Sequence, residues 1–509
     1  MTDFSIATLT SHFAATDSKY DVINPTSGKR IYELPQLSAE QVALEVDRAR
    51  DEQIDWAALQ VFERADIFLK VHDALLENED KILDLLQLET GKSRAHAYEE
   101  FSGAVGITRY YGKVAEKALS IKKAATGVPV LLKTFVRQEP IGVVGIITPW
   151  NYPLALAMMD VVPALIAGNC VVHKTDNQTT LISLLVRLLA VEAGLPEDAW
   201  RVVAGDGAEV GNAVTDNVDY VAFTGSTNTG RTVAQRAASR LIGFSLELGG
   251  KNPAIVLPSA DPAKAAEIIV AGCFGNAGQL CVSISRVYVP HAIKAEFEKE
   301  IIAIIEKLKV GKSNDFNFDI GSLTSAAQLA RVERYVNDAK AKGAQILIGG
   351  EALSEVGPYF FSPTAITNIG DDVLLKREEV FGPVLSIYGY DNIDEAVDAA
   401  NDSEFGLNSS VIGNRKEALK IAARINSGSV NINEGYRASF ASFGAPMGGT
   451  KHSGMGRRNG VGGLLRFTEA KAVGIARSVV GIGLPNTAKQ WKRMVPLMGA
   501  LAKILRRLP

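Results

Sequence analysis

The sequence predicts an α/β protein with two parallel-sheet domains and a small β arm. Two blocks of short apolar runs alternate with helix-length stretches, which is typical of βαβ units around a buried parallel sheet. The first block begins near residue 141 and the second covers residues 254–444. A chain of 509 residues is also too long for one ordinary core. We therefore expect two or three domains.

The stretch before the first block is expected to be helical. Apolar side chains in residues 38–59 and 62–76 recur three and four positions apart among charged ones, as on the buried face of an amphipathic helix. We expect these helices to pack around the first sheet. The strands of that sheet are predicted at Val143–Ile147, Cys170–Val172, Trp200–Val203 and Tyr220–Phe223.

The second block predicts a second sheet and leaves two extended segments over. Its strands are expected at Ala254–Leu257, Arg286–Val289, Gln345–Ile348 and Val384–Tyr388. The segments Val128–Gln138 and Ala472–Val480 also favour strands but belong to neither block. We expect an oligomerisation arm made from residues 126–140 and 466–485.

Residues 486–509 form a basic amphipathic tail. Its apolar and basic side chains are Trp491, Val495, Leu497, Met498, Leu501, Ile504, Leu505 and Leu508, and Lys489, Lys492, Arg493, Lys503, Arg506 and Arg507. Such a helix can lie on a membrane surface. Packing on the body or on a neighbouring subunit is the favoured expectation, because Pro496 and Gly499 weaken any single long helix.

The composition is that of a soluble globular protein. It is 47% hydrophobic and 22% charged with a formal net charge of −3, which gives no electrostatic reason to expect a nucleic-acid partner. The start of the chain lacks the pattern of a signal peptide. The most apolar window, 154–172, contains Asp160, Pro163 and Asn169, so it is a poor membrane span.

The cysteines and histidines predict a reducing compartment and no metal site. Cys170, Cys273 and Cys281 are an odd set without metal-type spacing, which favours the cytoplasm over a disulfide-forming environment. Cys170 and Cys273 lie in apolar segments, and we expect both to be buried and inert.

Glu247 and Cys281 are a candidate base and a candidate sulfur nucleophile. They stand in the words Glu247–Pro253 (Glu-Leu-Gly-Gly-Lys-Asn-Pro) and Asn276–Cys281 (Asn-Ala-Gly-Gln-Leu-Cys). A thiolate can attack a carbonyl carbon and form a covalent intermediate. A carboxylate can then activate the water that releases the product.

Two glycine-containing segments are candidates for a nucleotide site. Phe223–Gly230 follows a predicted strand and leads into a predicted helix, so backbone N–H groups near Gly225 and Ser226 can meet a pyrophosphate at the helix start. An ordinary strand-to-helix turn is the alternative. Gly205–Gly211 almost spells the dinucleotide fingerprint, but its third glycine is one place late, and we expect a turn there.

These words, together with Pro149–Pro153, Glu379–Pro383 and Ala445–Arg457, resemble the signatures of the NAD(P)-dependent aldehyde dehydrogenases over about residues 20–476. The resemblance implies that Cys281 attacks a small aldehyde and that Glu247 activates water. It implies that the Asn151 amide and the Cys281 N–H form the oxyanion hole. It also implies a cofactor-binding domain (1–125 and 141–247), a catalytic domain (248–445), and a homodimer or homotetramer.

The resemblance also assigns cofactor-binding residues. Lys174 matches the lysine that contacts the adenosine ribose, Glu379 the glutamate that holds the nicotinamide ribose, and Phe381 the ring against the nicotinamide. Trp150 and Leu248 join this set. Three positions beyond the lysine, where NAD users commonly have glutamate, this chain has Asn177. NADP is therefore expected, with NAD possible because Asp176 is acidic.

The substrate implied by the resemblance is succinate semialdehyde, as in the succinate-semialdehyde dehydrogenases of the actinobacterial type. Better-known members of that activity present two arginines to the substrate carboxylate, at positions where this chain has Gly275 and Met159. Arg437, with Ser439 nearby, is the predicted replacement. A broad-range aliphatic or aromatic aldehyde dehydrogenase is the alternative.

Three other functions compete with this interpretation. A coenzyme-A-acylating aldehyde dehydrogenase typically lacks the base that is present here as Glu247. A cysteine hydrolase without a redox step needs a histidine partner for its thiol, and no such pairing is evident in the sequence. A non-catalytic binding or membrane-associated protein would have no need for Cys281, Glu247 and Asn151.

Overall fold

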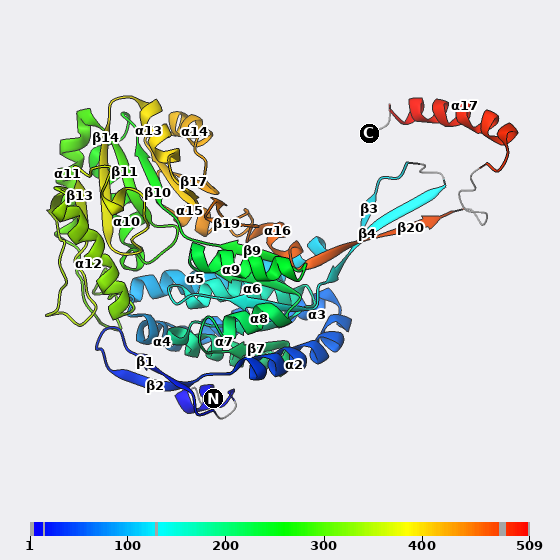
Figure 1. Cartoon of the computed structure of the whole chain (residues 1–509), viewed down its shortest axis with the longest axis horizontal. Helices are drawn as coiled ribbons and strands as arrows, with labels where there is room; N and C mark the ends of the chain where they lie inside the picture. Colours follow the sequence, from blue (N-terminus) through cyan, green and yellow to red (C-terminus); the bar gives the residue numbers. More distant parts are fainter. Residues whose placement is uncertain (1–4, 14–15, 128–130, 478–484, 507–509) are drawn as a thin grey trace. The chain divides into compact units, whose positions relative to one another are not determined.

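A computed structural model of the chain describes residues 5–13, 16–127, 131–477 and 485–506. Internal contacts divide the chain into two units. The first, called the body below, comprises residues 1–118 and 140–469, and the second comprises residues 119–139 and 470–509. The body contains both predicted parallel sheets (Figure 1).

The first sheet of the body has six strands in the order β19-β9-β8-β5-β6-β7. They are β5 (Val143–Ile147), β6 (Cys170–Lys174), β7 (Trp200–Val203), β8 (Tyr220–Thr224), β9 (Gly243–Glu247) and the short antiparallel β19 (Gly454–Met455). The other five strands are parallel. The four strands predicted in this block are confirmed. All residues of β5 to β8 are buried, which explains their continuous apolar runs.

The strand order places a ligand crevice in this sheet. The chain leaves β5 toward β6 and β7, then returns to the other side of β5 as β8 and β9. Ligands of open α/β sheets bind where the order reverses in this way, outside the carboxyl ends of the strands. Here that point lies between the ends of β5 and β8, which continue into Thr148–Asn151 and Gly225–Ser226.

Helices cover this sheet, including the two predicted near the start of the chain. α2 (Ala39–Ala58) packs against β5, β6 and β7, and α3 (Val61–Glu77) packs against other helices of the layer. The remaining helices of this part are α1 (Ile6–Thr10), α4 (Glu79–Thr90), α5 (Arg94–Leu119), α6 (Pro153–Ile166), α7 (Thr180–Glu192), α8 (Val210–Asn217), α9 (Thr227–Ser239) and α16 (Gly460–Leu465). A turn was predicted over Gly205–Gly211. Residues 205–209 do form the connection before α8, but Val210 and Gly211 are already the first two residues of that helix.

The second sheet has seven strands in the order β12-β13-β14-β11-β10-β16-β17. They are β10 (Asn252–Val256), β11 (Ile284–Pro290), β12 (Gln345–Ile348), β13 (Thr364–Thr367), β14 (Val384–Tyr390), β16 (Asn408–Ile412) and β17 (Ser429–Ile432). Only the edge strand β12 pairs antiparallel in this sheet. The four strands predicted in this block are confirmed, with ends shifted by a few residues.

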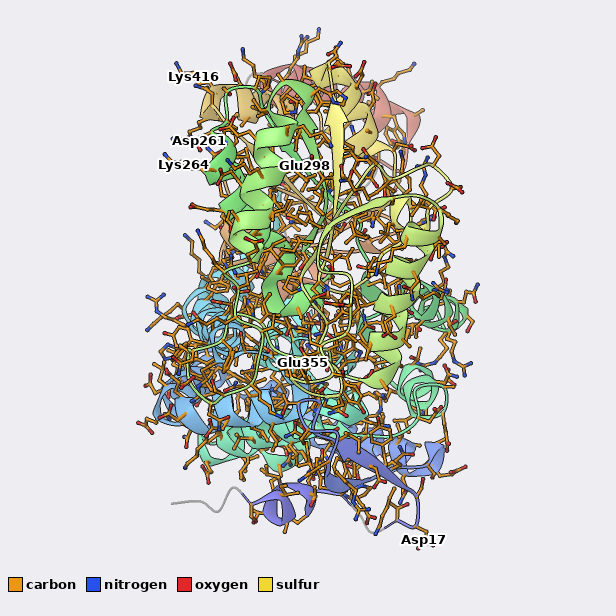
Figure 2. The ribbon with its side chains drawn as sticks, turned by 90° about the vertical axis from the view of Figure 1, so that its left-hand side faces the viewer. Asp17, Asp261, Lys264, Glu298, Glu355 and Lys416 are labelled. Atoms are coloured by element: carbon orange, nitrogen blue, oxygen red, sulfur yellow. The ribbon has the colours of Figure 1, made fainter. Side chains whose placement is uncertain are left out.

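Helices also flank the second sheet. They are α10 (Pro262–Phe274), α11 (His291–Ile305), α12 (Ala326–Ala341), α13 (Ile393–Asn401), α14 (Arg415–Ala422) and α15 (Arg437–Phe440). Apolar residues of α10, α11 and α12 form one core with β10, β11, β13 and β14. Charged side chains of these helices, including Lys264, Glu298 and Lys416, lie on the outer surface (Figure 2).

Several small elements were not predicted. Two antiparallel pairs occur: β1 (Lys19–Ile23) with β2 (Arg30–Pro35), and β15 (Phe405–Gly406) with β18 (Thr450–Lys451). Short 3₁₀ turns lie at Asn177–Thr179, Glu197–Ala199, Gly275–Gly278 and Leu374–Lys376.

The second unit contains a three-stranded sheet and the last helix. The sheet has the order β20-β4-β3, with β3 (Lys122–Ala124), β4 (Leu132–Pro140) and β20 (Thr468–Ala476). Both predicted extended segments are thus strands where they are described, while residues 128–130 and 478–480 lie outside the described residues. α17 (Ala488–Leu505) is one helix that passes through Pro496 and Gly499. The weakening expected at these residues does not interrupt the helix.

Candidate active site

Cys281 lies at the end of a loop that is held in an unusual backbone conformation. Asn276 and Ala277 have φ angles of 51° and 53°, in the left-handed region that non-glycine residues rarely adopt. At Gly278 (φ 70°) an added Cβ would lie 2.1 Å from the Gly382 carbonyl oxygen. The glycine therefore lets the nucleophile loop pack directly against the 379–383 loop. Local strain of this kind is concentrated at functional sites.

Asn151 follows β5 and contacts the same loop. Its side-chain Nδ2 donates to the backbone carbonyl of Gln279 at 3.0 Å. The backbone carbonyl of Asn151 accepts from Lys92 Nζ at 2.8 Å and from Asn276 Nδ2 at 3.1 Å. Lys92 is fully buried and paired with Glu100. An amide nitrogen carries two hydrogens, so Asn151 keeps a second donor for an oxyanion.

Glu247 is the last residue of β9, and its carboxylate is buried. Oε1 has no hydrogen-bond partner in the described part of the chain. Gly448 makes room for this atom, because a Cβ there would lie 2.7 Å from it. Burial raises the pKa of Glu247 to about 7. A general base is most effective when its pKa lies near the working pH.

A buried charge cluster lies next to Glu247. Asp160 Oδ1 and Oδ2 accept from Arg458 at 2.9 and 2.5 Å, and Asp160 also pairs with Arg466. Arg458 additionally donates to Thr224, the strand partner of Glu247. The charges of the two guanidinium groups oppose the effect of burial, so the pKa of Glu247 rises less than burial alone would raise it. The sequence offered one signal for this cluster, a single acid within the apolar window 154–172.

The Cys281 thiol is also in a desolvated environment. Burial, followed by the negative charges of Glu379 and Glu247, raises its pKa to about 12. The charge of Arg458 acts in the opposite direction. The raised pKa favours the thiol over the thiolate, so attack by the sulfur requires a proton acceptor.

Two adjoining cavities connect the predicted residues. A cavity of about 210 Å³ is lined by Trp150, Asn151, Leu156, Glu247, Leu248, Cys281, Arg331, Glu379 and Phe381, among others. A second cavity of about 630 Å³ is lined by Ile147, Lys174, Asp176, Asn228 and others. They share the wall residues 149–150 and 224–226. The second cavity lies at the crevice between β5 and β8.

Aromatic and acidic side chains stand where the two cavities meet. The rings of Trp150 and Phe381 are 5.6 Å apart at an interplanar angle of 89°, an edge-to-face arrangement. Glu379 Oε1 accepts from the Gly250 N–H at 2.9 Å, and burial raises the pKa of Glu379 to about 7. The Leu248 N–H donates to the Ser453 carbonyl at 2.9 Å.

The start of α9 borders the larger cavity. Ser226 is the N-cap residue, and its Oγ accepts from the Thr229 N–H at 3.2 Å. The N–H of Gly225 is not available to a phosphate, because it continues the β8–β9 pairing and donates to the Glu247 carbonyl at 3.0 Å. The backbone donors that remain at the start of α9 are those of the first turn near Asn228, which lines the cavity.

Lys174, Asp176 and Asn177 have different surroundings. Lys174 lines the larger cavity, and its ammonium has no hydrogen bond or ion pair with the described residues. Asp176 lines the same cavity and caps a 3₁₀ turn by accepting from the Gln178 N–H at 2.9 Å. Asn177 Oδ1 accepts from the Gly205 N–H at 2.9 Å. Two acids, Asp176 and Asp206, line the cavity, whereas Asn177 does not.

Arg437 and Ser439 are engaged in contacts of their own. Arg437 Nε donates to Glu99 at 2.7 Å, and Glu99 also accepts from Tyr436 at 2.6 Å. The Ser439 hydroxyl donates to the Tyr436 carbonyl at 3.0 Å. Neither residue lines the cavity around Cys281. A substrate carboxylate at Arg437 would have to compete with Glu99.

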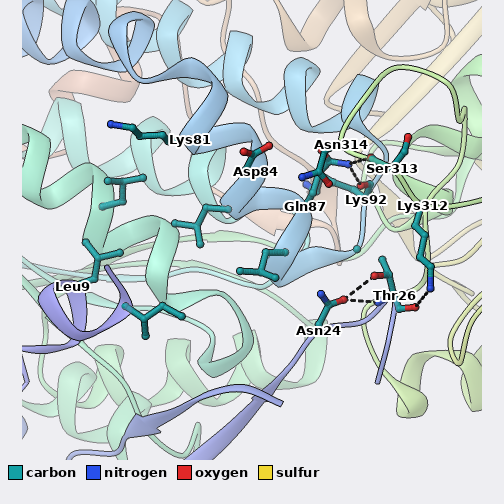
Figure 3. A pocket seen from close by; sticks show the side chains of 15 residues that line it. Leu9, Asn24, Thr26, Lys81, Asp84, Gln87, Lys92, Lys312, Ser313 and Asn314 are labelled. Carbon is teal, nitrogen blue, oxygen red and sulfur yellow. Dashed lines mark hydrogen bonds between the residues drawn. The ribbon is translucent and has the colours of Figure 1, made fainter. Parts of the chain in front are cut away.

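Other features lie apart from this site. Cys170 and Cys273 are buried and free, as predicted. No group of three or more metal-binding side chains occurs among the described residues. A separate cavity of about 460 Å³ is bordered by Asn24, Thr26, Lys81, Asp84 and Lys312 (Figure 3), and none of the predicted site residues lines it.

The fold and the site define a cysteine-based enzyme class with a nucleotide crevice, and comparison with known proteins gives the family. The model of the aldehyde dehydrogenase family matches residues 12–473. The chain therefore belongs to the aldehyde dehydrogenase family, which confirms the predicted fold class and the predicted class of enzyme.

Relatives and solved structures agree with this membership. A Mycolicibacterium smegmatis protein with the provisional name succinate-semialdehyde dehydrogenase (NADP+) is 44% identical over 94% of this chain and 93% of its own. An NAD-dependent aldehyde dehydrogenase from Sinorhizobium meliloti has a TM-score of 0.88 at 34% identity, over 93% and 94% of the two chains. Staphylococcus aureus betaine aldehyde dehydrogenase in complex with NAD+ has a TM-score of 0.85 at 32% identity, over 90% and 91%.

Proposed function

We propose that the protein oxidises an aldehyde to a carboxylic acid through a covalent intermediate on Cys281, with NADP as cofactor and NAD as a second possibility. The observation that carries this proposal is the placement of Cys281, Glu247 and Asn151 on one cavity that adjoins a nucleotide-sized cavity. The buried Oε1 of Glu247 also supports it, because this atom has no hydrogen-bond partner among the described residues and is free to accept a proton.

The first half of the proposed reaction forms a bond between sulfur and carbon. The Cys281 sulfur, after losing its proton to a carboxylate of the cavity other than Glu247, for which Glu379 is the candidate, attacks the aldehyde carbon. The second amide hydrogen of Asn151 and the Cys281 N–H stabilise the charge that develops on the oxygen. The thiohemiacetal then collapses to a thioester as hydride leaves. The nicotinamide of the bound cofactor supplies the acceptor for that hydride.

The second half releases the product. The carboxylate of Glu247 accepts a proton from water, which attacks the thioester carbon. The carbon–sulfur bond breaks, the carboxylic acid leaves, and the Cys281 thiol is restored. The positive charges of Arg458 and Arg466 keep part of Glu247 ionised near neutral pH.

The residues of the larger cavity fit an adenine dinucleotide phosphate. Lys174 offers an uncommitted cation, and the start of α9 offers backbone donors. The relatives named for NADP support its use, while Asp176 and the NAD+ complex of the betaine enzyme keep NAD possible.

Asn177→Glu is expected to move cofactor preference from NADP toward NAD by about tenfold in kcat/KM. A glutamate at this position adds a third acid to Asp176 and Asp206, and with it repulsion of roughly 1–4 kcal/mol against a 2′-phosphate a few ångströms away. Steady-state kinetics with both cofactors measures the ratio. Asn177→Gln is the neutral control and is expected to keep the wild-type preference. A wild-type enzyme that strongly prefers NAD would overturn the assignment.

We propose succinate semialdehyde as the substrate, on the basis of the names of the 44% identical relatives. Arg437 and Ser439 are the proposed carboxylate contacts. A neutral aliphatic or aromatic aldehyde is the second candidate. The pairing of Arg437 with Glu99 and the uncharged residues Met159 and Gly275 favour it.

If Arg437 binds the substrate carboxylate, Arg437→Ala should raise KM for succinate semialdehyde by about thirtyfold or more, because breaking such a charge pair costs roughly 2–5 kcal/mol. KM for butanal, a neutral aldehyde of the same carbon number, should change little. Glu99→Gln is the control for loss of the ion pair between Arg437 and Glu99. It is expected to free Arg437 and to lower KM for succinate semialdehyde. Equal changes for both aldehydes in Arg437→Ala would remove Arg437 from substrate recognition.

One assay separates the proposed reaction from its competitors. The protein is mixed with NADP and a panel of aldehydes, and the absorbance of the reduced cofactor is followed with and without coenzyme A. Reduction without coenzyme A supports the hydrolytic dehydrogenase. A strict requirement for coenzyme A would indicate acyl transfer, and no reduction with any aldehyde would indicate a hydrolase or a binding protein.

Assembly and location are proposals of the same kind. We propose a homodimer or homotetramer joined through the sheet of β3, β4 and β20, which light scattering can measure. The three free cysteines support a reducing compartment such as the cytoplasm.

A further inference from the structure

The last helix of the chain, α17, has two distinct faces. Its apolar side chains recur at three- and four-residue spacing and so occupy one side of the helix. These are Trp491, Met494, Val495, Met498, Leu501 and Leu505. None of the residues of α17 is buried, and Trp491, Val495 and Met498 are 45%, 60% and 47% exposed. The described residues of the second unit therefore leave the apolar side of α17 uncovered.

The basic side chains of α17 lie on the opposite side, which is bordered by the exposed Leu497 and Ile504. Lys489, Lys492, Arg493 and Lys503 lie on it, and the C-cap residue is Arg506. Residues 486–509 contain six Lys and Arg and no Asp or Glu. The small or helix-weakening residues Pro496, Gly499 and Ala500 also fall on this side, so the apolar side is continuous. The Thr487–Gln490 capping box fixes the start of the helix.

We propose that α17 docks the protein on a bilayer surface that carries anionic headgroups. A helix with Lys and Arg on one side and Trp, Met and Leu on the other lies in the plane of the interface, with its apolar side among the acyl chains. Its basic side contacts the headgroup charges. Lysine is depleted in protein–protein interfaces, and three of the four basic residues within α17 are lysines.

The docking is peripheral. No helix in the described part of the chain has the length and apolar character needed to cross a membrane. α17 itself has 18 residues and carries four charges along them. Binding by such a helix depends on both charge and apolar burial, so it is reversible and weakened by salt.

Co-sedimentation of the full chain with vesicles tests the proposal. The wild type is expected to bind vesicles of phosphatidylcholine and phosphatidylglycerol, and to bind pure phosphatidylcholine far more weakly. Lys492→Glu/Arg493→Glu/Lys503→Glu is expected to weaken binding by about a hundredfold, since each basic residue contributes about a factor of five. Trp491→Gln/Met498→Gln/Leu501→Gln keeps the charge and is expected to weaken binding by at least about tenfold.

A matched control reverses three positive charges on a different helix, α14. Arg415→Glu/Lys416→Glu/Lys420→Glu alters exposed residues of α14 by the same total charge, and Lys416 is seen on the surface in Figure 2. This variant is expected to bind vesicles like the wild type. All variants should keep their aldehyde oxidation rate, because none of these residues lines the active-site cavities.

Two outcomes overturn the proposal. The first is wild-type protein that ignores anionic vesicles, or α17 variants that bind as well as wild type. The second is a change in oligomeric mass on removal of residues 486–509 without any vesicle binding, which would assign α17 to a second copy of the chain.

Discussion

Cys281→Ala is expected to lower aldehyde oxidation by at least about a thousandfold while leaving cofactor affinity nearly unchanged. Removal of a nucleophile that acts as a unit with its base and oxyanion donors leaves only binding and electrostatic contributions. The sulfur lines the cavity with Asn151 and Glu247, whereas the larger cavity that contains Lys174 does not include it. Steady-state rates and fluorescence titration with NADP measure the two effects.

Cys273→Ala is the matched control for this experiment. Cys273 is buried in the core of the second sheet and its thiol lines neither cavity. Its replacement should keep full turnover, with only a modest loss of stability from the missing sulfur. Oxidation at wild-type rate by Cys281→Ala would reject the covalent mechanism, and inactivity of both variants would indicate a general structural defect.

Eight of the thirteen strands of the two sheets were predicted, and most of these could be recognised because both faces of the sheet are covered; β9, β13, β16, β17 and β19 were not. Val143–Ile147 is buried throughout, so its whole sequence is apolar and stands out from the helices. Trp200–Val203 is also buried throughout, and its three apolar residues still mark it as a strand although Arg201 interrupts them. The β1–β2 hairpin was missed for the opposite reason. Most residues of β1 are exposed, and charges such as Lys19 and Asp21 conceal the strand.

The site residues were found through short motifs, but their partners were not. The motif identified Glu247, while the residues that adjust its pKa, Arg458 and Arg466, come from a segment some two hundred positions later. Asn177 and Arg437 were predicted to face ligands, yet their side chains bind Gly205 and Glu99. Such contacts join segments far apart in sequence, and local pattern carries little information about them.

The environment of Cys281 and Glu247 makes the second half of the reaction the more sensitive to pH. Burial raises the pKa of Glu247, so its protonated form persists up to about pH 7. Only the carboxylate can accept a proton from water. Steady-state turnover limited by hydrolysis should therefore fall as the pH drops through about 7 and level off above it.

Glu247→Gln is expected to separate the two halves of the reaction. The amide cannot accept a proton, so thioester hydrolysis should slow by about a hundredfold or more, while the first hydride transfer still occurs. Rapid mixing should show a burst of about one reduced cofactor per active site and little turnover afterwards. The fall in turnover below about pH 7 should also disappear.

Glu267→Gln, at an exposed position of α10, is the control and should behave like the wild type. A variant at position 247 without a burst would place Glu247 in the first half, as the group that removes the proton from Cys281. Full steady-state turnover of Glu247→Gln would exclude Glu247 from both halves of the reaction.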